Sequence, residues 1–353
     1  MDCLASSPAV RKCRTALTRQ CGTPGSGPQI FFGKRAVDPD MVRMVCGIAL
    51  AVFLLVVIHL KQPVSLLIGF SHPQSAHSAL EVRSASELVN QLKVNKLWEI
   101  GPFTPVAPLQ VKSLPADIRF LDADTQKRAF LHTLLPVAMI ALSEVQGERQ
   151  ALEEILARLQ DVPRRLNFAL GEESDGVLKT LPPNELFFLR NLCEKYRTND
   201  VDLLLRRVNA VPVSLILAQG ALESSWGGSR FALEGNNLFG IWTWSAEGII
   251  PTQREDGKSH RVASYSSLLD SVRAYILMLN RLPAYSHLRS LREQSMDPLV
   301  LANGLRYYSE RREEYVADLA RMIRSNQLQV YDECALATMQ RGVRFVSLSK
   351  NML

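Results

Sequence analysis

The residue in this sequence best placed for acid chemistry is Glu223, which lies near the end of an apolar stretch. Pro212 suits the first position of a helix and Gly227-Gly228 suit its end, so we expect Glu223 in the last turn. A helix C-terminus and partial burial both disfavour a negative charge. Both effects predict a raised pKa, which a general acid requires. The alternative is an ordinary, solvated glutamate at a helix end.

Aromatic and amide side chains lie close to Glu223 in the sequence and suit sugar rings and their N-acetyl groups. Gln219 lies one turn earlier, on an adjacent face of the predicted helix. With Gln219, the residues that we expect to bind substrate are Trp226, Asn236, Asn237, Phe239, Trp242 and Tyr265. The same types also suit a core: Asn237 is expected to support its loop through its amide, and Phe239 to wedge the loop onto the helix.

Two segments around these residues form a specific pair of motifs, Ala221-Leu-Glu-Ser-Ser-Trp-Gly and Asn236-Asn-Leu-Phe-Gly-Ile. They resemble the glucosaminidase domain of glycoside hydrolase family 73. Further matches lie at 262–275, 283–285, 304–311 and Tyr315, and a segment at 127–136 is similar to the Bax-like bacterial members. The resemblance implies a lysozyme-like, mainly α domain with a small β-hairpin lobe. It also implies an enzyme that cuts peptidoglycan glycan strands without a cofactor.

The resemblance further implies a second catalytic group, because glycosidic cleavage usually pairs an acid with a base or nucleophile. Several family members take a second glutamate from the β-lobe, but the matching position here is Gln253. Glu255 and Asp256 lie close by and Glu247 lies earlier, and Glu255 is the candidate that we name. Glu255 and Asp256 also suit a plain hydrated turn. In that case the substrate's own N-acetyl oxygen attacks the anomeric carbon, the mechanism that we favour.

Tyr308 resembles the tyrosine of the family's cleft and is expected to orient the N-acetyl group or a water molecule. Tyr307 takes this role if the alignment shifts by one position. The predicted activity is that of an endo-acting β-N-acetylglucosaminidase that cuts between N-acetylglucosamine and N-acetylmuramic acid. One alternative is a lytic transglycosylase, which normally carries a Gly-Leu-Met-Gln-like segment where this chain has Asn-Leu-Phe-Gly. The other is a noncatalytic glycan-binding or envelope-scaffold protein, suggested by Gln253.

The N-terminal part of the chain has the composition of a membrane anchor with a basic leader. Residues 1–43 hold seven Lys/Arg against three Asp, which is most of the net charge of +6 and argues against a nucleic-acid-binding domain. Residues 44–60 are apolar apart from His59 and are long enough to span a bilayer. The leader then stays cytoplasmic, which places the domain in the periplasm of a single-pass inner-membrane protein. The alternative is initiation at Met41 or Met44 and a cleaved signal peptide, with a site at 76–78.

Composition and periodicity divide the rest of the chain. Residues 61–118 contain several prolines and predict an extended linker, with a brief helix possible at 84–97. Helical periodicity dominates the domain at 119–335, a β-hairpin or long loop is expected between Trp242 and Val262, and residues 336–353 form a tail. Cys193 and Cys334 form either a disulfide or two free thiols. No cysteine or histidine spacing indicates a metal site.

Overall fold

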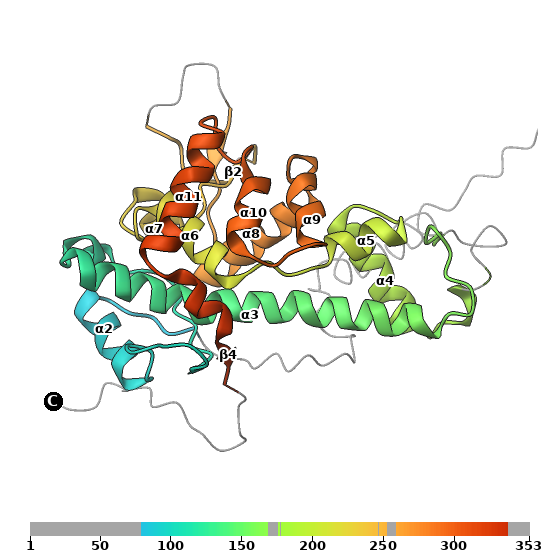
Figure 1. Ribbon diagram of the computed structural model, residues 1–353, viewed down its shortest axis with the longest axis horizontal. Helices are drawn as coiled ribbons and strands as arrows, with labels where there is room; N and C mark the ends of the chain where they lie inside the picture. Colours follow the sequence, from blue (N-terminus) through green and yellow to red (C-terminus); the bar gives the residue numbers. More distant parts are fainter. Residues whose placement is uncertain (1–78, 169–175, 177, 246, 253–258, 338–353) are drawn as a thin grey trace, which may run out of the picture. The chain divides into compact units, whose positions relative to one another are not determined.

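The computed structural model describes residues 79–168, 176, 178–245, 247–252 and 259–337 (Figure 1). The predicted leader at 1–43 and the predicted membrane segment at 44–60 lie outside the described residues. Residues 253–258, which include the predicted turn, and nearly all of the predicted tail at 336–353 also lie outside the described residues. The described part is mainly helical with a few short strands, which confirms the predicted fold class at that level.

Helix α3 (Ala123–Arg158) is the longest described helix, and in Figure 1 it runs between α2 (Ala85–Val94) below it and most of the other helices above it. Its N-cap is Asp122, whose carboxylate accepts a hydrogen bond from the Thr125 N–H at 3.0 Å. Within the described residues, α3 is long and apolar enough to cross a membrane, but 78% of its apolar window is buried inside the protein. Burial of that kind is typical of the central helix of a soluble core.

Two hydrophobic cores share α3. The larger one surrounds its N-terminal half with α6 (Val213–Ser224), α8 (Leu268–Arg281) and α11 (Glu313–Ser325). The smaller one packs the C-terminal part of α3 against α4 (Pro183–Tyr196) and α5 (Val201–Arg207). The other helices are α2 (Ala85–Val94), α7 (Arg230–Gly235), α9 (Ser286–Arg292) and α10 (Pro298–Ala302). Short 3-10 helices are η1 (Ala116–Phe120), η2 (Leu178–Thr180), η3 (Pro283–Tyr285), η4 (Asn303–Leu305) and η5 (Leu328–Glu333).

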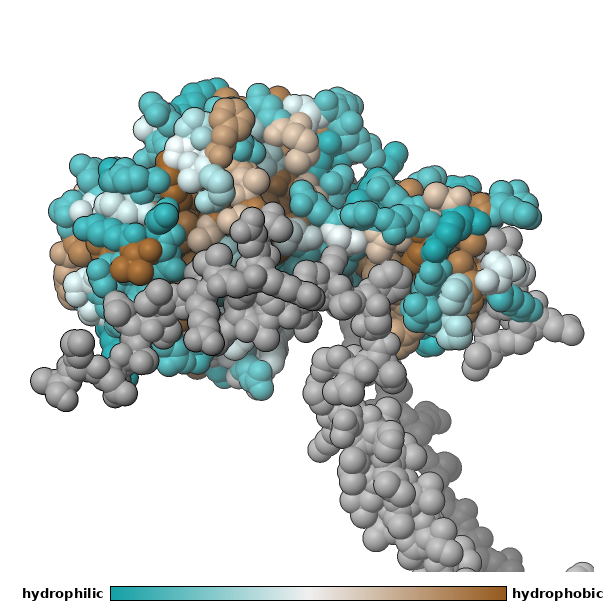
Figure 2. All heavy atoms as spheres, turned by 90° about the horizontal axis from the view of Figure 1, so that it is seen from below, coloured by the Kyte–Doolittle hydropathy of each residue, from teal (hydrophilic) through white to brown (hydrophobic). Residues whose placement is uncertain are grey.

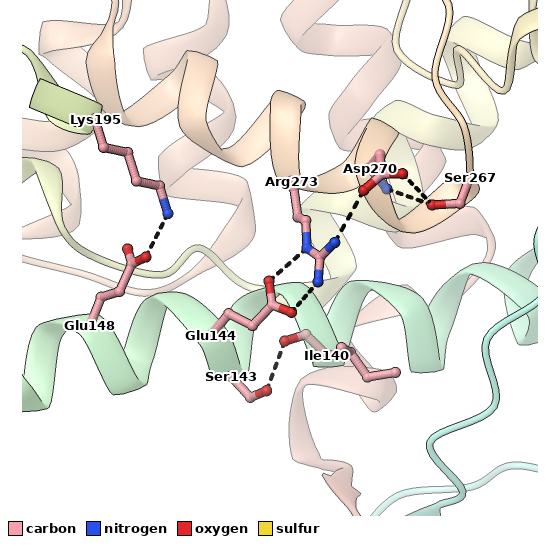
Figure 3. A network of polar contacts seen from close by, with 8 residues as sticks. All are labelled: Ile140, Ser143, Glu144, Glu148, Lys195, Ser267, Asp270 and Arg273. Atoms are coloured by element: carbon pink, nitrogen blue, oxygen red, sulfur yellow. Dashed lines mark hydrogen bonds and ion pairs between the residues drawn. The ribbon is translucent and has the colours of Figure 1, made fainter. Parts of the chain in front are cut away.

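Ion pairs join the middle of α3 to α8 and to α4 (Figure 3). Arg273 of α8 binds Glu144 of α3 through two hydrogen bonds and also donates to Asp270. One turn further along α3, Glu148 accepts a hydrogen bond from Lys195 of α4 at 2.6 Å. The two cores are therefore connected through charged side chains as well as through the shared helix.

The predicted linker is wrong from residue 79 onward, because this segment belongs to the larger core. Ser84 caps α2 by accepting a hydrogen bond from the Glu87 N–H, and Leu88 and Leu92 are fully buried. Strand β1 (Pro105–Val106) pairs in parallel with β4 (Ala335–Leu336) near the other end of the domain. The prolines of this segment therefore lie among packed elements, and Pro105 lies within β1 itself, so the segment is not an open tether.

The predicted β-hairpin is present as strands β2 (Trp242–Thr243) and β3 (Arg261–Val262), which pair in an antiparallel way with Trp242 opposite Val262. On the face that Figure 2 shows, hydrophobic residues are interspersed with hydrophilic ones. The most exposed large apolar side chains in the described part of the chain are Phe103, Phe120 and Trp244.

Cys193 and Cys334 are both free thiols. Cys193 lies in the smaller core, whereas Cys334 donates a hydrogen bond to the carbonyl of Gly101 in the larger one. The disulfide that was one alternative for this pair is therefore not formed in the structure.

Candidate active site

Helix α6, which carries Glu223, is enclosed on all sides, and not along a single stripe. Leu215, Ile216 and Leu217 are adjacent in sequence and all fully buried, so their side chains face different neighbours. Its first turn is held by Asp332 of η5, whose carboxylate accepts hydrogen bonds from the backbone N–H and the hydroxyl of Ser214 at 2.8 and 2.6 Å. The larger core thereby fixes both the position and the direction of the helix.

The chain reverses direction immediately after Glu223. Ser225, Trp226 and Gly227 have φ values of 52°, 56° and 79°, and the first two are in the left-handed region that side chains disfavour. The Ser224 hydroxyl supports the turn by accepting a hydrogen bond from the Gly227 N–H at 2.8 Å. The helix ends at Ser224, before the two glycines, and Glu223 lies in its last turn as predicted.

The carboxyl group of Glu223 contacts a tyrosine of α11. The Tyr315 hydroxyl donates a hydrogen bond to Glu223 Oε1 at 2.7 Å. Burial raises the pKa of Glu223, while the hydrogen bond from Tyr315 and the positive charge of Arg311 lower it by less. The other oxygen, Oε2, lies beside Gly240, where an added Cβ would be 3.8 Å away. Glu223 thus combines a proton-retaining environment with one oxygen that faces the loop after α7.

Tyr315, and not Tyr308, is the tyrosine that contacts Glu223. The Tyr308 hydroxyl donates to the carbonyl of Phe239 at 2.6 Å, and its ring stacks on that of Tyr315 at a centroid distance of 5.6 Å. Tyr307 is 53% exposed and lies close to the guanidinium groups of Arg306 and Arg312. In the sequence, Tyr315 was one of the further matches to the family, and its position gave no indication that it contacts Glu223.

Gln219 was expected to bind substrate, but its side chain is fully buried and bonds to other residues of the protein. Its Nε2 donates a hydrogen bond to the Tyr315 hydroxyl at 2.8 Å, and its Oε1 accepts one from the Tyr275 hydroxyl. Gln219 and Glu223 are four residues apart on α6 and therefore both reach Tyr315. The structure supports a positioning role for Gln219.

The loop that follows α7 is braced from within. Asn237 donates to the carbonyls of Ile241 and Ala263 at 2.9 and 2.8 Å, and its Oδ1 accepts from the backbone of Ile241. The Phe239 ring stacks on Tyr275 at a centroid distance of 4.1 Å. Asn237 therefore supports its loop and Phe239 packs the loop onto the core, the two roles predicted as alternatives to sugar contact.

Asn236, which was expected to bind substrate, is buried and adopts a left-handed conformation with φ 52°. Its Nδ2 donates to the carbonyl of Tyr265 at 3.1 Å. Tyr265 is half-buried, and burial raises its pKa to about 12. Both residues therefore connect the loop to the segment after β3.

Two tryptophans expected near substrate differ in exposure. Trp242 is 55% exposed, and its ring lies parallel to that of His260 at 4.4 Å. Trp226 packs edge-on against Phe130, with the Lys127 ammonium 5.5 Å above its ring. Trp242 is the better placed of the two to offer an aromatic face to a sugar.

The candidates for the second catalytic group are not brought to Glu223 by the described residues. Gln253, Glu255 and Asp256 lie outside them, and Glu247 is exposed near the hairpin. Within the described part of the chain, no other carboxylate contributes to the pKa of Glu223. The same part holds no group of three or more His, Cys, Asp or Glu side chains arranged for a metal ion.

Residues 201–328 match the Glucosaminidase family, which is described as mannosyl-glycoprotein endo-beta-N-acetylglucosaminidase. Protein bax of Escherichia coli (strain K12) is 27% identical over 229 residues, which are 61% of this chain and 75% of that protein. The peptidoglycan hydrolase FlgJ of the same organism is 35% identical over 201 residues, or 53% of this chain. The chain spans about half of the length of FlgJ, 52%.

Among solved structures, the catalytic domain of the autolysin Auto from Listeria monocytogenes is 24% identical with a TM-score of 0.29. That match covers 47% of this chain and 98% of the autolysin domain. The segment matched by the family contains Glu223, the braced loop and Tyr315.

Proposed function

We propose that this chain, which carries a glucosaminidase domain of glycoside hydrolase family 73 at residues 201–328, is a peptidoglycan hydrolase. The bond cut is the one between N-acetylglucosamine and N-acetylmuramic acid. Similarity to a protein named as a peptidoglycan hydrolase supports the substrate class. The motifs at 221–227 and 236–241 support the bond.

Glu223 is the general acid of the proposed reaction. The observation that carries this role is a half-buried carboxyl group, without a direct cationic partner in the described residues, whose pKa burial raises. Such a group stays protonated to higher pH than an exposed glutamate and can transfer its proton to the oxygen of the leaving sugar. Because Tyr315 donates to Oε1, the transferable proton belongs on Oε2, the oxygen beside Gly240.

The second step needs a group that attacks the anomeric carbon. We carry forward substrate assistance, in which the N-acetyl oxygen of the sugar is that group. It is supported by Gln253, which stands where several family members carry the second glutamate. A double variant, Glu255→Gln with Asp256→Asn, separates the two mechanisms. Substrate assistance predicts that the double variant retains most of the activity, whereas a loss of more than about 100-fold would assign a catalytic carboxylate to the hairpin.

Digestion of isolated sacculi by the purified full-length protein tests the activity and the acid together. Reduction of the products followed by mass spectrometry identifies the new chain ends. We expect reducing N-acetylglucosamine ends from the wild type and almost none from Glu223→Gln. Glu194→Gln, an exposed carboxylate of α4 bound to Arg190, is the matched control and should release as much product as the wild type.

Each other outcome points to a specific alternative. Anhydromuramic ends would identify a lytic transglycosylase. Equal release by the wild type and Glu223→Gln would remove Glu223 from the mechanism. No release by either protein, together with retention on sacculi in a sedimentation assay, would identify a noncatalytic glycan-binding or scaffold protein.

Peptidoglycan as substrate places the domain in the periplasm, with residues 44–60 as a single inner-membrane anchor. Those residues lie outside the described part of the structure, so support comes from their composition. Mass spectrometry of the mature N-terminus decides between the anchor and the cleaved signal peptide. A new terminus following residues 76–78 would exclude the anchor.

A further inference from the structure

Four side chains form a continuous line of hydrogen bonds that ends at the proposed general acid. The Tyr275 hydroxyl donates to Gln219 Oε1, and Gln219 Nε2 donates to the Tyr315 hydroxyl at 2.8 Å. The Tyr315 hydroxyl in turn donates to Glu223 Oε1 at 2.7 Å. Gln219 and Tyr275 are both fully buried, so water does not compete for these bonds at the inner end of the line.

The direction of the line follows from the number of hydrogen atoms available. A tyrosine hydroxyl has one hydrogen, and an amide has a donating and an accepting end. Because Gln219 donates to Tyr315, the single Tyr315 hydrogen is free to point at Glu223. Because Tyr275 donates to Gln219, the accepting end of the amide must face Tyr275.

The reversed amide would have two unfavourable consequences. The Tyr275 hydrogen would face the Gln219 NH₂ group and would be buried without an acceptor in the described residues, which is unfavourable. The Tyr315 hydrogen would also be drawn to Gln219. Glu223 would then turn its own proton toward the Tyr315 oxygen and away from the side that faces Gly240.

We infer that Tyr275 and Gln219 are positioning residues that fix the direction of the Tyr315 hydrogen bond and thereby hold the transferable proton of Glu223 on Oε2. The inference rests on the proposed role of Glu223 as general acid. It assigns a function to Tyr275, which does not touch Glu223, and replaces sugar contact with positioning for Gln219.

Other titratable and charged groups face Glu223 and must be kept constant in any test. Arg311 acts on it from the segment before α11, and Tyr308 and Tyr285 lie in the same aromatic group. The Tyr285 ring is 6.1 Å from that of Tyr308, and its hydroxyl is not part of the line of hydrogen bonds. Tyr285→Phe is therefore a control that makes the same chemical change at a similar depth.

The direct test measures the pKa of Glu223 by NMR titration of full-length protein carrying ¹³C-labelled glutamate carboxyl groups, with the signal assigned by Glu223→Gln. Loss of a hydrogen bond to the ionised form raises a pKa. We expect Tyr315→Phe to raise the pKa of Glu223 by about one pH unit, since one such bond is worth roughly that much. Tyr275→Phe and Gln219→Leu should raise it in the same direction by less, and Tyr285→Phe should not raise it.

A second readout separates positioning from packing and from substrate contact. The alkaline limb of the kcat profile should move to higher pH in Tyr275→Phe and Gln219→Leu, with KM unchanged. A role in packing alone would lower Tm and leave the limb in place. A higher KM for Gln219→Leu would return Gln219 to the sugar-binding residues.

The result that overturns the inference is an equal Glu223 pKa in Tyr275→Phe, Tyr285→Phe and the wild type. If Tyr275→Phe does not fold, Gln219→Leu supplies the same comparison. The titration needs no turnover. An inactive wild type with the expected order of pKa values would therefore reject the proposed function while leaving the positioning role in place.

Discussion

Among the residues that the structure describes, two buried tyrosines each donate a hydrogen bond to a glutamate, one in each core. Tyr315 donates to Glu223 at 2.7 Å in the larger core, and Tyr196 donates to Glu148 at 2.8 Å at the smaller one. Glu148 also accepts a hydrogen bond from Lys195 at 2.6 Å. Among the described residues, Glu223 has no direct cationic partner, because the nearby Arg311 is bound to Asp318.

This difference separates a structural carboxylate from one suited to catalysis. A carboxylate with an adjacent ammonium group forms an ion pair that holds two helices together, as Figure 3 shows for Glu148 of α3 and Lys195 of α4. A partly buried carboxyl group without such a partner has a raised pKa and is better suited to give away a proton. The same pair of residue types therefore has different chemistry in the two cores.

The largest expected effect is on activity and comes from changing Glu223, the glutamate without a direct cationic partner. Glu223→Gln should lower the rate of glycan cleavage by roughly 10²- to 10⁴-fold, the range for loss of a general acid, without lowering Tm. Glu148→Gln should leave the rate per folded molecule unchanged. The comparison fails if the two variants lose activity to a similar degree in the sacculus assay.

The next largest effect is on stability and comes from changing Glu148, the glutamate paired with Lys195. Glu148→Leu leaves the Tyr196 hydroxyl and the Lys195 ammonium without this acceptor, so the free energy of unfolding should fall by roughly 1–3 kcal/mol. Urea denaturation followed by circular dichroism measures this change. An unchanged midpoint would mean that the ion pair does not hold α3 to α4.

The pH dependence of the wild type gives a third test. A general acid works while it is protonated, so activity should fall about tenfold per pH unit once the pH exceeds the pKa of Glu223. Burial raises that pKa above 4.5, so the decline should begin at higher pH than for an exposed glutamate. A decline already complete near pH 4.5 would contradict the proton-retaining environment.

The smallest expected effect concerns the exposed aromatic residues near the two sites. Trp242→Ala, on β2, should raise KM roughly threefold to tenfold with a smaller change in kcat, because it removes a face suited to sugar rings. Phe187→Ala, a 38% exposed aromatic of α4 in the smaller core's region, should leave KM unchanged. Equal KM values for both variants would remove Trp242 from the substrate-binding residues.

Local pattern was sufficient for several features of the site. Pro212 and the two glycines at 227 and 228 indicated the approximate ends of α6, which runs from Val213 to Ser224, and so placed Glu223 in the last turn. The raised pKa of Glu223 was also predicted, and its main cause in the structure is burial. Asn237 was expected to support its loop because a short amide readily bonds nearby backbone groups. These inferences succeeded because helix ends and tight loops depend on neighbouring residues.

Partners distant in the sequence were not predictable in this way. The sequence singled out Tyr308 to orient the N-acetyl group or a water molecule, and it did not indicate that Tyr315, 92 positions from Glu223, donates a hydrogen bond to that carboxyl group. It also left residues from 79 to 118 as a linker, although β1 pairs with β4 across the whole domain. Both outcomes depend on how helices and strands pack, which short-range spacing does not encode.

By itself, the sequence determined that a glutamate ends an apolar helix, followed by an amide-rich loop, because helix ends and turns are set by adjacent residue types. The tertiary structure alone decided which glutamate lacks a cation and which tyrosine donates to it. The physical reason is that burial and hydrogen-bond direction are properties of the assembled core. The Glu148–Tyr196 pair has the Lys195 ammonium beside its carboxylate, whereas the Glu223–Tyr315 pair has the Gln219 amide in its place and can serve as an acid.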